Sequence, residues 1–211
     1  METYFRQLAS FFSLSSSLQE MLRFTCSIRQ LRKGELVFPP DEQRSALFVL
    51  QTGILRCFIL GGGGEEITDS FLFRYGEAFL GSAVLPGGKP ELCANAEAMA
   101  PTSLIVVDMA RLLPAVTQTP ELQALACRLL CRSYRRQWEH KRILYHCSAE
   151  DRYRWFLQNY PGLINHVVHS SVASYLGVTP VTLSRVRKKL EAECASAPDR
   201  LPPAASESRR F

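Results

Sequence analysis

The chain has 211 residues, of which 46% are hydrophobic and 21% charged, proportions that are typical of a globular protein with one core or two small ones. No apolar run approaches the roughly 20 residues that a membrane-spanning helix needs, and no export signal is recognisable at the N-terminus. The seven scattered cysteines lack a Cys-x-x-Cys pair, so we expect a cytoplasmic protein without a membrane partner.

The net charge of +5 is unevenly distributed along the chain. Residues 1–110 hold 9 Lys+Arg and 12 Asp+Glu, a net −3, whereas residues 111–211 hold 16 and 8, a net +8. A basic second part predicts that only this part binds a polyanion.

The first hundred residues predict short helices followed by a β domain. Residues 14–24 have helical spacing, with possible N-caps at Ser15 to Ser17. Runs of β-branched and aromatic residues then alternate with Gly and Pro, as in a jelly roll. Gly53 suits a tight hairpin turn, and the glycines at 61–64 suit a flexible hairpin tip. The expected strands are 27–32, 35–38, 46–51, 54–60, 65–71, 92–98 and 103–107.

A long helix is predicted after the β domain. Pro120 suits the first helical turn, and residues 121–146 contain no Gly or Pro. Two apolar stripes suggest two contacts, one with the β domain and one with a partner helix across a dimer axis. The stripes are Leu122, Leu125 and Leu129, and Cys127, Leu130, Tyr134 and Trp138. A further helix should begin at about Ser148 and end near Pro161-Gly162.

Residues 170–190 have the pattern of a helix-turn-helix. Gly177 lies where a first helix must end in a left-handed conformation. Thr179 and Pro180 suit the N-cap and the first turn of a second helix. Apolar residues of both helices are expected to share a core: Val172, Leu176, Val178, Leu183 and Val186.

The outward face of the second helix is polar and basic, as a recognition helix in the major groove requires. We expect Arg185 to donate two hydrogen bonds to guanine, and Lys188 and Lys189 to contact phosphates. An ordinary helical hairpin with a solvated basic face is the alternative. The predicted DNA-binding residues are Ser170, Thr179, Pro180, Val181, Thr182, Ser184, Arg185, Lys188 and Lys189.

Residues 33–190 as a whole resemble the CRP/FNR family of bacterial transcription regulators. The resemblance is carried by Gly34-Glu35, the run Leu-Phe-Val-Leu-Gln-Thr-Gly at 47–53, Gly76-Glu77 and the helix-turn-helix. It implies an α+β fold in which an N-terminal β-roll of the cyclic-nucleotide-binding-like type precedes a long dimerisation helix and an all-α helix-turn-helix domain. It also implies that a dimer reads two half-sites one DNA turn apart.

The expected boundaries follow from these patterns. The sensor domain with its N-terminal helices is placed at 1–118, the dimerisation helix at 119–147 and the helix-turn-helix domain at 148–193. Residues 194–211 lack periodicity and predict a disordered tail, and no β-hairpin wing is recognisable after Leu190.

The chain departs from family members that bind cyclic AMP. Such members hold the ribose with Gly-Glu and the phosphate with Arg-Ser, where this chain has Gly81-Ser82 and Leu92-Cys93. A phosphate without that arginine would lose roughly 1.5–3 kcal/mol, so we expect an unknown effector other than cyclic AMP. The pocket is predicted at Gly76, Glu77, Phe79, Gly81, Ser82, Leu92 and Cys93.

The recognition helix departs from the family as well. Pro180 and Val181 stand where the catabolite activator protein, for which the family is named, reads bases with Arg and Glu, and only Arg185 matches. The operator should therefore differ. The predicted partners are duplex DNA and a second copy through residues 119–147, with RNA polymerase as a further candidate.

Nothing in the sequence predicts catalysis, a cofactor or a metal. No nucleophile elbow, P-loop or paired catalytic carboxylates are recognisable, and the four histidines lie outside the β region, unlike those of a metal-dependent barrel enzyme. Packing is favoured over sensing for Cys127 and Cys131, and over a base-stacking platform for the aromatic residues Trp138, Tyr153, Trp155 and Phe156. Two alternative functions are a small-molecule-binding module that acts through protein partners and a metal-dependent barrel enzyme.

Overall fold

Two antiparallel sheets form the first half of the molecule. The computed structural model describes residues 2–37, 46–80 and 95–196. One sheet has the strand order β1-β7-β2-β5 and the other β4-β3-β6. The strands are β1 (Cys26–Leu31), β2 (Ala46–Thr52), β3 (Leu55–Leu60), β4 (Glu66–Leu72), β5 (Ala78–Leu80), β6 (Asn95–Ala98) and β7 (Thr102–Asp108).

The inner faces of the two sheets share one apolar core. Phe48 and Leu104 of the four-stranded sheet pack with Leu55 and Leu72 of the other, and all four side chains are buried. This sandwich confirms the predicted β-roll of an α+β protein. The sequence pattern missed β5, and the strand predicted at 35–38 is reduced to an isolated bridge at Leu36, with Phe38 outside the described residues.

Gly53 makes the tight connection between β2 and β3 that the sequence predicts. Its φ is +96°, and a Cβ atom there would lie 2.4 Å from Oγ1 of Thr102 and 2.6 Å from the carbonyl oxygen of Pro101. Only glycine fits this backbone. The glycines at 61–64 join the antiparallel strands β3 and β4, as expected for a hairpin tip.

Three helices cover the outer face of the four-stranded sheet: α1 (Glu2–Phe12), α2 (Ser16–Arg23) and α3 (Met109–Val116). Ser15, one of the predicted N-caps, caps α2: its Oγ accepts the N–H of Leu18 at 3.3 Å. The sequence analysis did not predict α3. Asp108 caps it by accepting the N–H of Arg111 at 3.2 Å.

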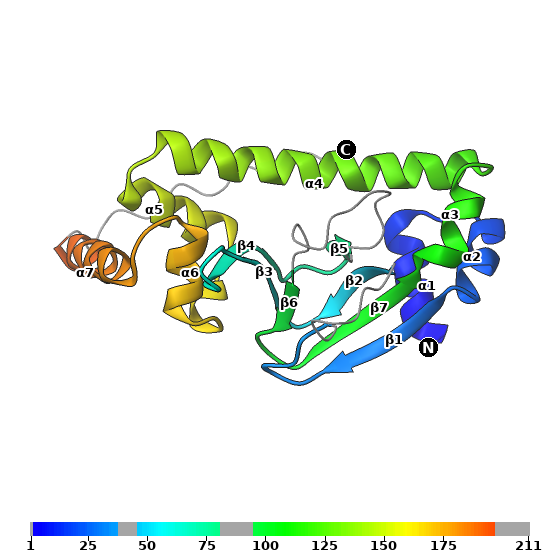
Figure 1. Cartoon of the computed structure of the whole chain (residues 1–211), viewed down its shortest axis with the longest axis horizontal. Helices are drawn as coiled ribbons and strands as arrows, with labels where there is room; N and C mark the ends of the chain where they lie inside the picture. The colour runs from blue at the N-terminus through cyan, green and yellow to red at the C-terminus, as the bar shows by residue number, and fades with distance from the viewer. Residues whose placement is uncertain (1, 38–45, 81–94, 197–211) are drawn as a thin grey trace.

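The helix α4 (Pro120–His146) runs along one side of the molecule, from α3 to the C-terminal helices (Figure 1). Leu122 is buried against the N-terminal helices, and Ile143 is buried near the other end. Pro120 occupies the first turn, as predicted. One helix thus contacts both ends of the molecule.

The C-terminal helices form a separate layer at the far end of α4 (Figure 1). They are α5 (Ala149–Asn159), the 3₁₀ turn η3 (Leu163–Asn165), α6 (His169–Tyr175) and α7 (Pro180–Ser196). The last helix continues to Ser196, so the tail prediction was wrong for its first three residues, where no Gly or Pro interrupts the helix. The rest of the predicted tail lies outside the described residues.

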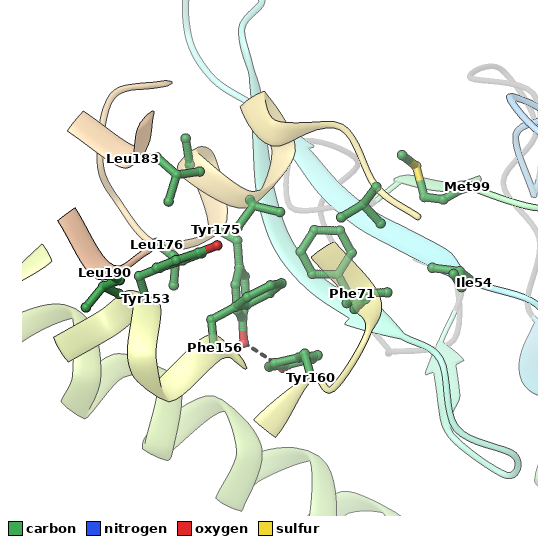
Figure 2. Packing of buried hydrophobic residues seen from close by; sticks show 14 residues of the cluster. Ile54, Phe71, Met99, Tyr153, Phe156, Tyr160, Tyr175, Leu176, Leu183 and Leu190 are labelled. Atoms are coloured by element: carbon green, nitrogen blue, oxygen red, sulfur yellow. Dashed lines mark hydrogen bonds between the residues drawn. The ribbon is translucent and has the colours of Figure 1, made fainter. Parts of the chain in front are cut away.

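The β-roll and the C-terminal helices share a core. Phe71 of β4 packs with Phe156 and Tyr160 of the α5 region and with Tyr175 of α6 (Figure 2). The hydroxyls of Tyr160 and Tyr175 are hydrogen-bonded at 2.7 Å. In addition, the backbone N–H of Thr68 on β4 donates to Oγ of Ser174 on α6 at 2.9 Å. The relative orientation of these two parts therefore depends on buried side chains as well as on α4.

Candidate nucleic-acid interface

The turn between α6 and α7 has the geometry that the sequence predicts. Gly177 has a φ of +62°, and the N–H of Val178 donates to the carbonyl of Ala173 at 3.0 Å. Oγ1 of Thr179 accepts the N–H of Thr182 at 3.1 Å and so caps α7. The Thr179 hydroxyl therefore serves as the N-cap of α7.

The two helices also share the predicted core. Val172, Leu176 and Leu183 are buried in the cluster that contains Phe71, and Val178 and Val186 pack against it. This packing fixes the angle between α6 and α7 and leaves the opposite face of α7 exposed among the described residues.

The exposed face of α7 is formed by four residues at helical spacing. At 3.6 residues per turn, Val181, Ser184, Arg185 and Lys188 share one side of the helix, opposite the buried Leu183. Val181 is 60% exposed and contributes the apolar part of this face. Within the described residues, neither Arg185 nor Lys188 forms an ion pair or a hydrogen bond, so both remain available to a ligand.

Lys189 differs from its neighbours on α7. Its Nζ lies 2.6 Å from Oε2 of Glu150 on α5 and 3.8 Å from Oε1 of Glu193. Arg154 contacts the same two carboxylates. Lys189 and Arg154 together lower the pKa of Glu150. A DNA phosphate at this flank would have to compete with Glu150 for Lys189.

Arg152 fixes the turn, a role that the sequence analysis missed. Its Nη1 donates to the carbonyl of Leu176 at 3.0 Å, and its Nε donates to the carbonyl of Cys147 at 2.9 Å. One guanidinium therefore joins the end of α4 to the turn of the helix-turn-helix. Leu176 lies 24 residues after Arg152, so no local sequence pattern predicts the contact with the turn.

The side of α4 that faces away from the molecule carries an exposed apolar stripe. Trp138 is 57% and Tyr134 70% exposed, and their rings are stacked with centroids 6.4 Å apart. Leu130, Cys127 and Cys131 are exposed on the same side. Among the residues that the structure describes, the packing predicted for Trp138 and the two cysteines does not occur. Leu122 of the other predicted stripe is buried, and Leu125 packs beside it.

Two residues predicted to line the effector pocket make structural contacts. Oε2 of Glu77 accepts the N–H groups of Phe73 at 2.8 Å and Arg74 at 3.0 Å, and its Oε1 lies 3.4 Å from Nη1 of Arg136 on α4. Phe79 is buried between the sheets. Glu77 therefore joins the turn before β5 to α4.

The remaining pocket residues are not placed in one site. A Cβ on Gly76 would lie 2.2 Å from the ring of Phe11, so this glycine permits a close approach of α1. Gly81, Ser82, Leu92 and Cys93 lie outside the described residues. The effector pocket stays a prediction.

A cavity of about 250 Å³ lies between β4 and α4, and its described lining does not include Gly76, Glu77 or Phe79. Asp69, Arg136, His140 and Lys141 line it. His140 stacks on Tyr175 with ring centroids 4.0 Å apart, and its Nε2–H donates to the Tyr175 carbonyl at 2.8 Å. Burial lowers the pKa of His140. Among the residues that the structure describes, no group of three or more potential ligands could hold a metal ion.

The other aromatic residues pack as predicted. Tyr153 and Phe156 are buried, and Trp155 packs against the same cluster. His166 and His169 are both exposed. In the part of the chain that is described, no helix is both long and apolar enough to cross a membrane.

The fold and this surface define a class of protein: a regulator with a β-roll, a long helix and a C-terminal helix-turn-helix. No protein-family model matches the chain. Over 170 residues it is 26% identical to the transcriptional activator protein FnrA of Stutzerimonas stutzeri, in an alignment that covers 75% of this chain and 68% of FnrA.

Solved structures have the same architecture. The fold matches FixK2 from Bradyrhizobium japonicum with a TM-score of 0.67 at 22% identity, covering 80% of this chain and 85% of FixK2. The catabolite activator protein of Thermus thermophilus matches with a TM-score of 0.50 at 26% identity, covering 92% of this chain and 90% of that protein. In sequence and in fold the chain is therefore similar to transcription regulators of the CRP/FNR family.

Proposed function

We propose that the protein binds duplex DNA as a homodimer, with one copy of α7 in each of two successive major grooves. The exposed face of α7 carries this proposal, because Arg185 and Lys188 are exposed and unpaired within the described residues while the opposite face is buried. A helix of this kind enters the major groove, where side chains near its N-terminus reach base edges. The major groove of B-DNA is wide enough to hold an α-helix.

The dimer is supported by the exposed stripe of α4. Leu130, Tyr134 and Trp138 follow one another at four-residue spacing on the side opposite Leu122. Parallel helices that bury such stripes form coiled coils. A second copy of α4 would cover these side chains and would present two recognition helices. RNA polymerase is the candidate further partner of the DNA-bound dimer.

The first experiment selects genomic fragments with the purified full-length protein over a range of salt concentrations. We expect an enriched site whose binding weakens as salt rises, because phosphate contacts release counterions. Absence of any enriched fragment at every salt concentration would contradict the proposal. A stable protein complex without DNA binding would instead favour a module that acts through protein partners.

Two substitutions then separate base reading from phosphate contact. Arg185→Ala should weaken the enriched site by about 1–3 kcal/mol and relax its sequence preference, whereas Lys188→Ala should weaken all sequences alike. Lys33→Ala is the matched control, since it removes one exposed positive charge on the β-roll. Competition binding with mutated sites measures the difference. Equal losses on all sequences for both substitutions would remove Arg185 from base recognition.

A further inference from the structure

A histidine and an arginine face each other on one flank of α7, outside the residues already assigned to DNA. His169 is the first residue of α6, and its Nε2 lies 3.0 Å from Nη1 of Arg187 on α7. Arginine has only N–H donors, so Nε2 of His169 must accept this hydrogen bond.

The pair lines a cavity of about 270 Å³ between α6 and α7. The titratable and charged groups that face His169 there are Tyr153 of α5 and Arg187, Lys188 and Glu191 of α7. Glu191 accepts from Nε of Arg187 at 2.7 Å. A tyrosine is already uncharged near neutral pH, and burial raises the pKa of Tyr153 further. Two cations thus stand against one carboxylate, which leaves the cavity with an excess positive charge.

The cavity adjoins the exposed face of α7. Ser184 and Lys188 belong both to that face and to the cavity lining. When a recognition helix enters the major groove, the first helix of the motif crosses the DNA backbone. His169 lies at the beginning of that first helix, so a backbone phosphate would pass over the cavity.

We propose that His169 and Arg187 form a proton-linked phosphate site, an inference that rests on the proposed DNA binding. A phosphate oxygen enters between the two side chains, and His169 takes up one proton from solvent. Both side chains then donate to the phosphate, and the hydrogen bond between them is lost. A protonated imidazole opposite a guanidinium is unfavourable without an anion, so proton and phosphate bind together. The affinity for DNA therefore increases as pH falls.

The test measures binding of the full-length protein to a fluorescent duplex of arbitrary sequence, between pH 6 and pH 8 at constant ionic strength. Such a duplex reports phosphate contacts without an operator. One linked proton changes affinity by at most about tenfold per pH unit. We expect wild-type protein to gain about tenfold more affinity between pH 8 and pH 6 than His169→Gln, which cannot titrate.

Two further variants separate this site from general effects of charge. Arg187→Gln should reduce the slope of log affinity against log salt by about one, as expected when one phosphate contact is lost. His166→Gln removes an exposed histidine three residues away and should keep the wild-type pH dependence. Circular dichroism at each pH establishes that every variant is folded.

The outcomes separate the two proposals. Equal pH dependence in wild type and His169→Gln overturns the phosphate site and leaves DNA binding intact. Loss of pH dependence in His166→Gln also overturns it, because the proton would then belong elsewhere. Failure of wild-type protein to bind any duplex at low salt overturns both.

Discussion

Basic side chains on one helix differ in what they can bind. Arg185 and Lys189 are four residues apart on α7, and the sequence presents both as DNA contacts. In the structure Arg185 is unpaired within the described residues, whereas Lys189 is held by Glu150, 39 positions away. Exposed ion pairs contribute little to stability, but they neutralise charge locally. The basic face of α7 could therefore be predicted from the sequence, but the ion pair of Lys189 with Glu150 could not.

The stacked His140 makes stability depend on pH. Because burial lowers its pKa in the folded protein, the unfolded chain binds the proton more readily. The stabilising contribution is therefore fully present above about pH 6.5 and is lost as pH falls through the lower folded value. Urea unfolding at several pH values should show a smaller decrease between pH 7 and pH 5 in His140→Phe than in wild type.

The control for this experiment is His146→Gln, which alters an exposed histidine on the same helix. This variant should follow the wild-type pH dependence. If His140→Phe and wild type lost stability in parallel, the titrating group would have to lie elsewhere in the fold.

At the scale of elements, the long helices were predictable because their signals are local. The absence of Gly and Pro after Pro120 indicates α4, and Gly177 with Thr179 marks the turn before α7. By contrast, β5 has only three residues and no alternation, so its pairing with β2 determines it. The hydrophobic pattern did not predict α3 either, because Pro114 interrupts the segment. The one local signal for this helix was its N-cap, Asp108.

The exposed stripe of α4 leads to a prediction about assembly. Trp138→Glu places a charge in the middle of the proposed dimer interface, where burial without a partner is unfavourable. Sedimentation equilibrium should therefore detect a shift from dimer to monomer. Ser133→Glu adds the same charge at an exposed position of α4 away from the stripe and should leave the dimer unchanged. A Trp138→Glu protein that remained fully dimeric would place the interface elsewhere.

At the scale of the whole molecule, the shared core makes the sensor and the DNA-binding helices mechanically dependent on each other. Phe71 reaches from β4 into a cluster whose other members come mainly from α5, α6 and α7. This contact between the predicted domains could not be predicted from the sequence, because residues about one hundred positions apart form it. Hydrophobic patterns identify buried faces without specifying which faces meet.

Truncation of Phe71 tests that dependence. Phe71→Ala should reduce the free energy of unfolding by about 3–5 kcal/mol, through lost burial and a residual cavity. We also expect the unfolding of the β-roll and of the C-terminal helices to separate into two transitions by calorimetry. Phe24→Ala, at an exposed phenylalanine, should change stability by less than about 0.5 kcal/mol. A single transition with wild-type stability in Phe71→Ala would contradict the coupling.

The hydrogen bond from Thr68 to Ser174 has a consequence for any movement of the DNA-binding helices. The strand β4 is an edge strand of its sheet, and an unpaired backbone N–H of an edge strand can pair with a strand of another molecule. Here α6 covers that N–H. A rearrangement that moved α6 away from β4 would expose this edge strand to other chains. A second conformation of the protein must therefore cover β4 in another way, or the protein would tend to self-associate.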